Sequence, residues 1–216
     1  MTHARPLPDF LAERHRRWRA ALTGETRAHL ARLAEKGQSP AAMIVACCDS
    51  RVMADDVFGA EAGDFFIHRN IANLVPGYAA DGAYRGTSAT VEYAVTVLQV
   101  AHLIVMGHRG CGGVAACLER HGGVEDPGPA RNLVENWISI LAPRVQGVVA
   151  RGLEAEAAQR ALEHEAVLLG LENLMTFPFV ADAVSAGTLQ LHGLWKDIGA
   201  GLLEYYDAER GAFVPV

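Results

Sequence analysis

The feature that most restricts the fold is a series of short apolar runs separated by longer stretches with helical periodicity. Most of these runs contain no polar interruption, which is typical of strands that are buried on both faces of a parallel sheet. The predicted strands are 42–47, 64–68, 103–106 and 188–192. Because a parallel pair needs a long crossover connection, the intervening stretches are expected to be helices that pack on the sheet.

Apolar residues at helical spacing predict helices in the segments between and around these strands. The predicted helices are 8–36, 87–100, 130–150, 153–174 and 178–186, and the Gly- and Pro-rich stretch 122–129 predicts a loop. This order indicates an α/β fold with a mostly parallel central sheet flanked by helices, and residues 1–36 form an N-terminal helical arm. In open sheets of this kind ligand sites lie beyond the carboxyl ends of the strands, so functional residues are expected there.

The composition favours one compact domain over 1–216, because half of the 216 residues are hydrophobic. A formal net charge of −6 without a basic block argues against nucleic acid as a partner. The first residues lack the apolar core of a secretory signal, and no run of 18 apolar residues occurs, so no membrane span is expected. We therefore expect a cytoplasmic protein with reduced thiols, which bind metals or react more often than they crosslink.

Two clusters of reactive side chains follow predicted strands. The first is the segment 47–51, in which strand alternation places Cys47, Asp49 and Arg51 on one side and Cys48 on the other. The second is 107–113, in which His108 and Cys111 are three residues apart. Two thiolates and one imidazole are zinc ligands, and a set of three leaves the fourth tetrahedral position open, as catalytic zinc sites do.

Each of these residues also has an ordinary structural interpretation. A cysteine in an apolar strand is usually a small core residue, and this applies most to Cys48 and Cys117. Asp49 and Arg51 could form a structural ion pair. The functional alternative is that paired hydrogen bonds from Arg51 keep Asp49 ionised beside the metal without letting it become a ligand. The convergence of both clusters on strand ends favours the metal interpretation.

The two clusters resemble the β-class carbonic anhydrases in their motifs C-x-D-x-R at 47–51 and H-x-x-C-G-G at 108–113. The similarity extends through 63–73, 86–95 and 191–193 and so covers most of the chain. The resemblance implies one zinc ion per chain held by Cys47, His108 and Cys111, with Asp49 and Arg51 as a catalytic pair. It also implies reversible hydration of carbon dioxide to bicarbonate. It further implies a homodimer or higher even oligomer, with active sites near the interface and an N-terminal helix that embraces the partner.

The resemblance also implies a substrate pocket. In one style of site within the family, a Gln, a Phe and a Tyr line the pocket, and Gln38, Phe66 and Tyr93 stand at those positions. The other style has an inhibitory bicarbonate site built from a Trp, a Tyr and an Arg, of which only Arg69 is present here. Backbone N–H groups of Gly112 and Gly113, at a helix start, are expected to help hold a developing anionic oxygen.

One residue departs from the family pattern, since Arg109 follows His108 where a small Ser or Thr is usual. Its long cation could block the pocket, attract anions or point to solvent. Two thiolate ligands neutralise zinc formally, so the pKa of bound water is expected to lie above that of a site with three neutral ligands. Two other functions remain open: a hydrolase of carbonyl sulfide or carbon disulfide on the same scaffold, and a non-catalytic zinc protein that senses bicarbonate or redox state.

Overall fold

The computed structural model describes residues 3–80, 85–123 and 128–216, which form two compact units, Met1–Gln38 and Ser39–Val216. The predicted loop 122–129 lies partly outside the described residues. The expectation of a single domain over 1–216 stays a prediction. Among the described helices, none is by itself long and apolar enough to cross a membrane, and only Ala155–Leu174 and Pro178–Ser185 together, bent by 87°, reach that length and composition.

The N-terminal unit contains two helices, α1 (Asp9–Ala21) and α2 (Gly24–Lys36), so the prediction of one helix over 8–36 was wrong. The first helix ends before Leu22, whose ψ of 124° is not helical, and Thr23 is the residue that caps the start of α2. The Thr23 side chain accepts a hydrogen bond from the N–H of Thr26, which is a standard N-cap interaction. No residue of α1 or α2 is buried.

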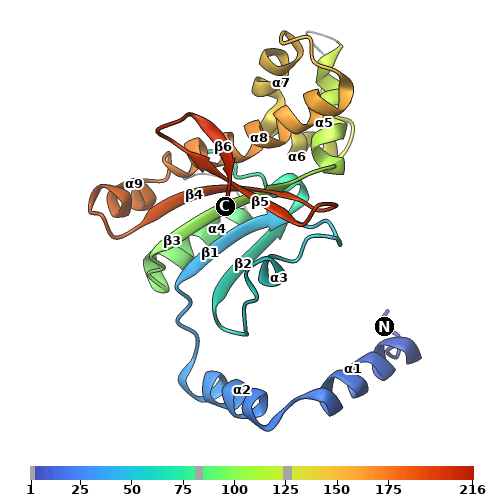
Figure 1. Cartoon of the computed structure of the whole chain (residues 1–216), viewed down its shortest axis with the longest axis vertical. Helices are drawn as coiled ribbons and strands as arrows, with labels where there is room; N and C mark the ends of the chain where they lie inside the picture. The colour runs from blue at the N-terminus through green and yellow to red at the C-terminus, as the bar shows by residue number, and fades with distance from the viewer. Residues whose placement is uncertain (1–2, 81–84, 124–127) are drawn as a thin grey trace. The chain divides into compact units, whose positions relative to one another are not determined.

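The second unit is built on a six-stranded sheet with the strand order β2-β1-β3-β4-β5-β6 (Figure 1). The first four strands in this order are parallel, and β5 and β6 are added antiparallel at one side. The strands are β1 (Ala42–Cys47), β2 (Phe65–Asn70), β3 (His102–His108), β4 (Gln190–Asp197), β5 (Leu202–Asp207) and β6 (Ala212–Pro215). The predicted mostly parallel α/β architecture is therefore confirmed.

The prediction of the fourth strand was wrong, and two further strands were missed. The fourth strand begins and ends later than 188–192, because the chain after Ala186 still makes the turn that follows α9 and reaches the sheet only at Gln190. The β5–β6 hairpin was not predicted, since its residues are a mixture of partly buried and exposed ones rather than an apolar run. These strands pair antiparallel, and such sheets tolerate one solvent-facing side.

Helices and short turns fill the connections between the strands, and they include several breaks that periodicity did not predict. After β2 comes the short turn η1 (Ile71–Asn73). Where one helix 87–100 was predicted, the structure has α4 (Gly86–Glu92) followed by a wider helical turn, η2 (Tyr93–Val97). The predicted helix 130–150 is divided into α6 (Leu133–Ile138), η3 (Ser139–Leu141) and α7 (Ala142–Val149). The remaining helices are α3 (Ala54–Phe58), α5 (Gly112–Gly122), α8 (Ala155–Leu174) and α9 (Pro178–Ser185).

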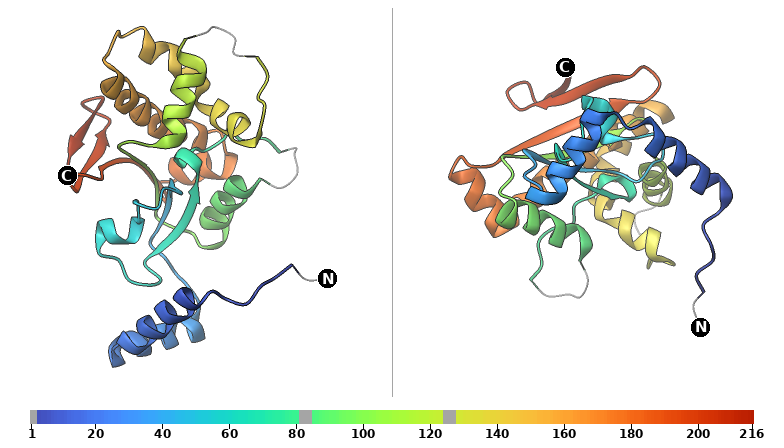
Figure 2. Two further views of the ribbon diagram at one scale, coloured as in Figure 1. Left: turned by 90° about the vertical axis from the view of Figure 1, so that its right-hand side faces the viewer. Right: turned by 90° about the horizontal axis from the view of Figure 1, so that it is seen from below.

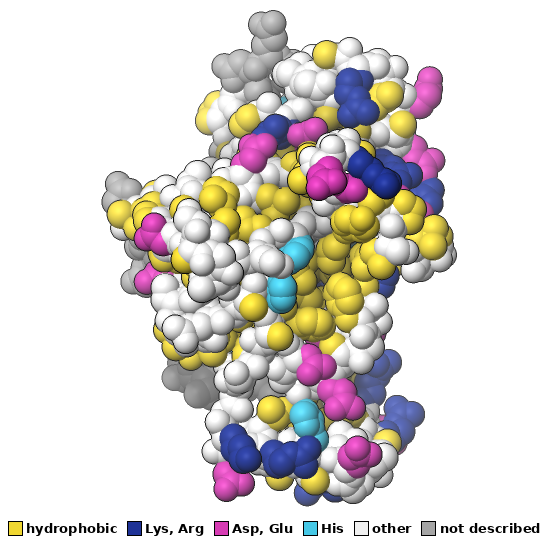
Figure 3. Space-filling model, turned by 60° about the vertical axis from the view of Figure 1, so that its left-hand side comes forward, with side chains coloured by type: hydrophobic (Ala, Val, Ile, Leu, Met, Phe, Trp, Pro, Cys, Tyr) yellow, Lys and Arg dark blue, Asp and Glu magenta, His cyan; other side chains and the backbone are white. Residues whose placement is uncertain are grey.

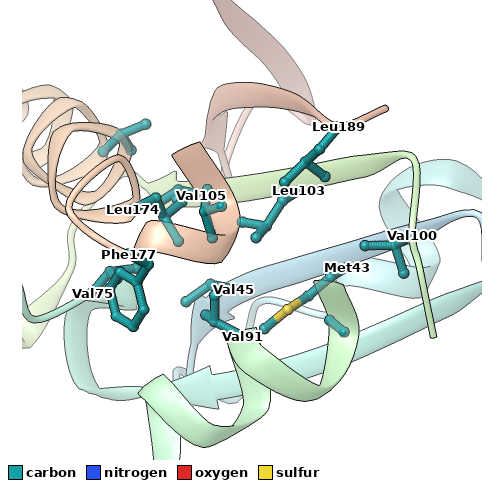
Figure 4. Packing of buried hydrophobic residues seen from close by; sticks show 13 residues of the cluster. Met43, Val45, Val75, Val91, Val100, Leu103, Val105, Leu174, Phe177 and Leu189 are labelled. Atoms are coloured by element: carbon teal, nitrogen blue, oxygen red, sulfur yellow. The ribbon is translucent and has the colours of Figure 1, made fainter. Parts of the chain in front are cut away.

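Three buried clusters of described residues surround the sheet. One lies between the sheet and helices α4, α8 and α9, and it contains Met43, Val45, Leu103 and Phe177 (Figure 4). The opposite side chains of β1 and β3 pack with α3 and its preceding loop. A third cluster joins α5, α6, α7 and α8 beyond the carboxyl ends of β1 and β3, where the helices gather at one end of the sheet (Figure 2). Cys47 and Cys111 belong to this third cluster.

Candidate metal centre

The ends of two neighbouring central strands bring three potential metal ligands together. Cys47 is the last residue of β1 and His108 the last of β3, while Cys111 follows three residues later, just before α5. All three side chains are buried, and their ligand atoms lie within 4.8 Å of one another. The two Sγ atoms of Cys47 and Cys111 are 3.9 Å apart. The structure thus brings together all three residues that the sequence singled out as ligands.

A tight turn after β3 aims Cys111 back at the strand ends. Gly110 adopts a left-handed φ of 69°, which glycine reaches without steric cost, and Cys111 then occupies the position before α5. Gly113 lies against the left-handed turn at Ala72, because a Cβ on Gly113 would be 2.7 Å from Cγ2 of Ile71 and 3.0 Å from Cβ of Ala72. Only glycine at 113 allows this approach, which packs the start of α5 beside the end of β2.

The bonding of the His108 ring leaves one nitrogen free to bind a metal. Its Nδ1 lies 3.0 Å from the carbonyl oxygen of Arg109, to which it donates, whereas Nε2 is buried and without a hydrogen-bond partner among the described residues. Two sulfur ligands at about 2.3 Å from one tetrahedral zinc ion would lie ~3.8 Å apart. The observed sulfur separation and the unpaired Nε2 both fit such an ion.

The two thiols respond to their surroundings in opposite directions. The hydrogen bond from Cys111 lowers the pKa of Cys47, and His108 and the backbone N–H groups of Asp49 and Ala72 act in the same direction, against the effect of burial. The Cys47 thiolate and burial together raise the pKa of Cys111. The two buried sulfur atoms, 3.9 Å apart, thus disfavour a negative charge on both at once. A cation between them would favour ionisation of both thiols.

Asp49 lies beside these ligands and is held by Arg51. The guanidinium donates from Nε to Oδ1 at 2.9 Å and from Nη2 to Oδ2 at 2.7 Å, and the Arg51 backbone N–H also donates to Oδ1 at 2.9 Å. These hydrogen bonds lower the pKa of Asp49 well below its usual range. Oδ2 lies 4.0 Å from Nε2 of His108, so the carboxylate is next to the candidate metal position.

Arg109 does not enter this space. Its guanidinium pairs with Glu156 at the start of α8 and, at 3.0 Å, with Asp197 at the end of β4, and about half of its side chain is exposed. Of the three possibilities raised by the sequence, the structure supports the one in which the cation is directed toward solvent. The Arg69 guanidinium is also fully engaged by hydrogen bonds, because it donates to the backbone carbonyl oxygens of Cys47, Asp49 and Val52.

The predicted substrate-pocket residues are not all brought to this centre. The rings of Phe66 and Tyr93 pack together with centroids 5.8 Å apart. Phe66 is paired with Met43 in the sheet, whereas Cys47 is paired with Asn70, four residues along. At about 3.3 Å per residue, Phe66 therefore lies ~13 Å from Cys47 of its own chain. Gly112 is the first residue of α5, adjacent to Cys111. Gln38 belongs to the N-terminal unit.

The two remaining cysteines differ in burial, since Cys117 is buried and Cys48 is exposed. Cys117 is fully buried in the third cluster, as the core interpretation predicted. Cys48 is exposed, so its interpretation as a core residue was wrong, because β1 ends at Cys47 and the following residue is no longer packed between helices. Strand alternation correctly predicted that Cys48 points away from the ligand group.

A buried carboxylate behind the centre was missed by the sequence analysis. Glu163 on α8 has only 2% of its surface exposed and accepts a hydrogen bond from the N–H of Cys111 at 3.0 Å. Its neighbours on the inward side of α8 are apolar, namely Ala166, Val167 and Gly170 at helical spacing. A carboxylate in the middle of an apolar helix face is the sequence signal that would have identified it.

Comparison with known proteins agrees with this geometry. A family model described as carbonic anhydrase matches residues 42–203. The chain is 35% identical over 167 residues to the chloroplastic beta carbonic anhydrase 5 of Arabidopsis thaliana (76% of this chain, 53% of the relative). It is 34% identical over 178 residues to beta carbonic anhydrase 3 of the same plant (81% and 67%). The chain thus spans about half of one curated relative and two thirds of the other.

Solved structures extend the likeness over nearly the whole chain. The β-carbonic anhydrase CcaA is similar with a TM-score of 0.86 and 30% identity, covering 96% of this chain and 98% of that one. CafA of Aspergillus fumigatus gives 0.78 and 33%, covering 93% and 92%. A tetrameric β-carbonic anhydrase of Sordaria macrospora gives 0.77 and 26%, covering 95% and 98%. The chain, with a Cys-His-Cys group on this fold, belongs to the β-carbonic anhydrase family.

Proposed function

We propose that the chain is a zinc-dependent enzyme that catalyses the reversible hydration of carbon dioxide to bicarbonate and a proton. The observation that carries this proposal is the buried convergence of Cys47, His108 and Cys111, with Nε2 of His108 unpaired. We assign one zinc ion per chain to this group, because three protein ligands leave a position open for chemistry. When bound, zinc supplies Lewis acidity, which lowers the pKa of water.

Asp49 and Arg51 are the catalytic pair in this proposal. Asp49 stays ionised and has Oδ2 within 4.0 Å of Nε2 of His108, so it can accept a hydrogen bond or a proton from a water molecule at this position. Arg51 engages both carboxylate oxygens, which keeps Asp49 from turning onto the metal in place of water. Asp49 can therefore hold such a water molecule from beside the metal without filling the open position.

The start of α5 supplies the groups for the developing bicarbonate oxygens. Gly112 and Gly113 are the first residues of this 11-residue helix, whose early backbone N–H groups carry a partial positive charge. In the described part of the chain, no atom outside the adjoining backbone lies within 4 Å of where a Cβ would stand on Gly112, so the space beside this backbone is open. We assign Gly112 to substrate binding for this reason.

We further propose that a second copy of the chain completes the substrate pocket with its Phe66, Tyr93 and Gln38. The separation of about 13 Å along the sheet supports this, because Phe66 is too far from the ligands of its own chain to line their pocket. Phe66 and Tyr93 form one aromatic pair on the edge strand β2 and η2, and Tyr93 is 44% exposed. An edge position lets a partner approach these rings.

The surface offers a site for such a partner. Hydrophobic side chains gather around histidine side chains on one face of the molecule (Figure 3). A groove of about 460 Å³ on the sheet unit is lined largely by apolar residues, including Ala42, Phe58, Phe65, Ile104, Leu191 and Tyr205. The N-terminal unit carries eight basic and four acidic residues, whereas Ser39–Val216 carries 11 basic and 21 acidic ones. Opposite charge and exposed apolar residues on α1 support a homodimer or higher even oligomer in which this arm covers a partner.

The cytoplasm is our proposed location, supported by the four free cysteines, which fit a reducing compartment. Carbon dioxide and bicarbonate are the proposed substrate and product, and the excess of acidic residues in Ser39–Val216 supports a protein that does not bind nucleic acid.

The proposal is tested by offering the same zinc-loaded sample two substrates. Stopped-flow measurement should show rapid hydration of carbon dioxide that a sulfonamide inhibits, and much slower consumption of carbonyl sulfide or carbon disulfide. A higher rate with either sulfur compound would instead make the chain a hydrolase of that compound. Zinc binding without either activity would identify a non-catalytic sensor, although Arg109, the residue that would close such a site, is paired elsewhere.

A further inference from the structure

Glu163 is a buried carboxylate that contacts a metal ligand without being one. It lies in the middle of α8, and its surface is almost completely covered. Its Oε1 accepts the backbone N–H of Cys111 at 3.0 Å, which ties the ligand loop after β3 to a long core helix. Burying a carboxylate is costly unless it is fully hydrogen-bonded, so the position of Glu163 calls for a role.

Among the described residues, the hydrogen-bond partners of the Glu163 carboxylate are N–H donors. Oε1 accepts from Cys111 N and from Nε2 of Gln159 at 3.1 Å, and Oε2 accepts from the indole Nε1 of Trp195 at 3.0 Å. A carboxylate is an acceptor only, whereas a protonated acid or an amide would place a hydrogen of its own against one of these donors. The three donors therefore favour the ionised carboxylate at 163, whereas burial acts against it and raises the pKa of Glu163 above its usual range.

We propose that Glu163 is a positioning residue that fixes Cys111 as a metal ligand. This inference rests on the proposed function, because it presupposes a metal at the Cys-His-Cys group. Cys111 lies between the left-handed Gly110 and the start of α5, where its N–H has no helical partner of its own. By holding that N–H, Glu163 sets the backbone orientation that directs Sγ toward the sulfur of Cys47.

Two further contacts make the carboxylate a rigid support. Trp195 on β4 is 1% exposed, and the guanidinium of Arg160 lies 4.5 Å from its ring centroid, so the indole donor cannot turn away. Gln159, one turn before Glu163 on α8, donates to Oε1 and also contacts the carbonyl oxygen of Cys111 at 3.4 Å. Both backbone polar groups of the ligand are thus held from α8. Groups that orient a metal ligand in this way typically change metal affinity about 10–100-fold when they are altered.

The test compares metal binding in variants that change the acceptor at 163. Glu163→Gln keeps one oxygen for Cys111 but turns an NH₂ group toward the indole N–H. We expect zinc release to a chromogenic chelator to be about 10–100-fold faster than in the wild type. The cobalt-substituted variant should also show shifted thiolate-to-cobalt and visible absorption bands. Adding Trp195→Phe removes the opposing donor, so the double variant should return to the release rate and spectrum of Trp195→Phe alone.

Val180→Ala is the matched control. It removes buried volume from the cluster between the sheet and helices α4, α8 and α9, which does not include Cys47, His108 or Cys111. It should lower thermal stability and leave zinc release and the cobalt spectrum unchanged. If Glu163→Gln does not fold, Glu163→Leu/Trp195→Phe replaces it and is compared with Glu163→Gln/Trp195→Phe. These two differ in the acceptor for Cys111, and the leucine variant should release zinc faster.

Wild-type release and spectrum in Glu163→Gln would overturn the proposal, as would an equal change in Val180→Ala. So would a double variant that remains as fast as Glu163→Gln, since the lost charge rather than the position of Cys111 would then be responsible. A wild-type chain that binds neither zinc nor cobalt contradicts both this inference and the proposed function. A wild-type enzyme that binds zinc and hydrates carbon dioxide, with an unaffected Glu163→Gln variant, contradicts this inference alone.

Discussion

At the scale of single residues, the centre is defined by what the other atoms of each side chain are bonded to. The Nδ1 atom of His108 donates a hydrogen bond to the Arg109 carbonyl oxygen, which leaves Nε2 available to bind a metal ion. Both carboxylate oxygens of Asp49 accept hydrogen bonds from the Arg51 guanidinium, which also donates to the carbonyl oxygen of Gly110 at 3.1 Å. The arginine therefore joins the segment after β1 to the turn that carries Cys111.

Removing the Arg51 guanidinium should release Asp49. In Arg51→Ala, the Asp49 carboxylate, whose Oδ2 lies 4.0 Å from Nε2 of His108, is free to turn toward the metal and fill the open position. We expect zinc to be retained and carbon dioxide hydration to fall by about 100-fold, the scale of a lost proton-transfer group. Arg210→Ala, which removes an exposed arginine paired with Asp207, is the control and should keep full activity. Full activity in Arg51→Ala, with Asp49 unmoved in its structure, would refute the assigned role.

The substitution Arg109→Ser tests the unusual cation beside His108. Because Arg109 is paired with Glu156 and Asp197 and is half exposed, its charge is balanced away from the centre. We expect kcat/KM for hydration to rise with pH above neutrality along the same curve in the wild type and in Arg109→Ser. The measurement is stopped-flow hydration across pH 6–9. A wild-type profile that is already flat at neutral pH, and steep only in the variant, would place the arginine in the pocket.

The convergence of Cys47, His108 and Cys111 could be predicted from sequence because each lies at or just after the end of an apolar strand, and parallel strands bring their carboxyl ends together. Glu163 could not, because its link to Cys111 depends on how closely α8 crosses the sheet, which periodicity does not specify. The same reasoning applies to Phe66, whose distance from Cys47 is fixed by the register of β2 against β1.

At the scale of elements, the parallel strands and long helices were predictable, whereas the breaks within helices were not. The Thr23 cap depends on a side-chain hydrogen bond to the backbone, and the wider turn η2 depends on longer-range backbone hydrogen bonds. The spacing of apolar residues reveals neither. The β5–β6 hairpin is held by partly polar contacts with α8. Arg160 donates to Glu204 at 2.6 Å, and the His164 ring stacks on Phe213 at 4.1 Å between centroids.

This contact between α8 and the hairpin should weaken in acid. Burial, and then the charges of Arg160 and Arg151, lower the pKa of His164 to about 4. Glu204 lies only 3.5 Å from its Nε2, but Arg160 already neutralises that carboxylate, so we expect the lowered pKa to hold. As the pH falls below about 6.5, the unfolded chain binds the proton first, so stability present above that pH is lost progressively toward pH 4.

The expected loss is about 3 kcal/mol over this range, and His164→Gln, which cannot titrate, should lack it. Urea unfolding at several pH values between 4.5 and 7.5 measures the difference between the two proteins. The advantage of the wild type over His164→Gln should shrink as the pH is lowered. A difference that does not change with pH would show that His164 titrates normally in the folded protein.

At the scale of the whole molecule, the charge is divided unevenly between a basic N-terminal unit and an acidic sheet unit. The arm buries none of the residues of its two helices, and it exposes Phe10 and Trp18 by 63% and 54%. Large apolar side chains that are exposed together indicate an interaction surface. The division of charge and the apolar groove on the sheet unit favour association between copies.

Sedimentation equilibrium should therefore give a mass of twice 23.1 kDa or a higher even multiple. Phe10→Ser/Trp18→Ser should shift the population toward the monomer while far-UV circular dichroism stays the same, because neither residue is buried in the single chain. Val216→Ser, which alters an exposed residue at the C-terminus, is the control. A wild-type monomer, or an arm variant that associates as strongly as the wild type, would rule out the arm as the contact.

The central claim is that Cys47, His108 and Cys111 hold one zinc ion on which hydration depends, and the paired cysteines at the end of β1 test it most directly. Zinc content per chain and carbon dioxide hydration are measured on the same samples of wild type, Cys47→Ser and Cys48→Ser. Cys47 is buried within the ligand group, whereas Cys48 is exposed outside it. We predict about one zinc per chain and full activity in the wild type and Cys48→Ser, and loss of both in Cys47→Ser. Retention of zinc and activity in Cys47→Ser, with their loss in Cys48→Ser, would contradict the account.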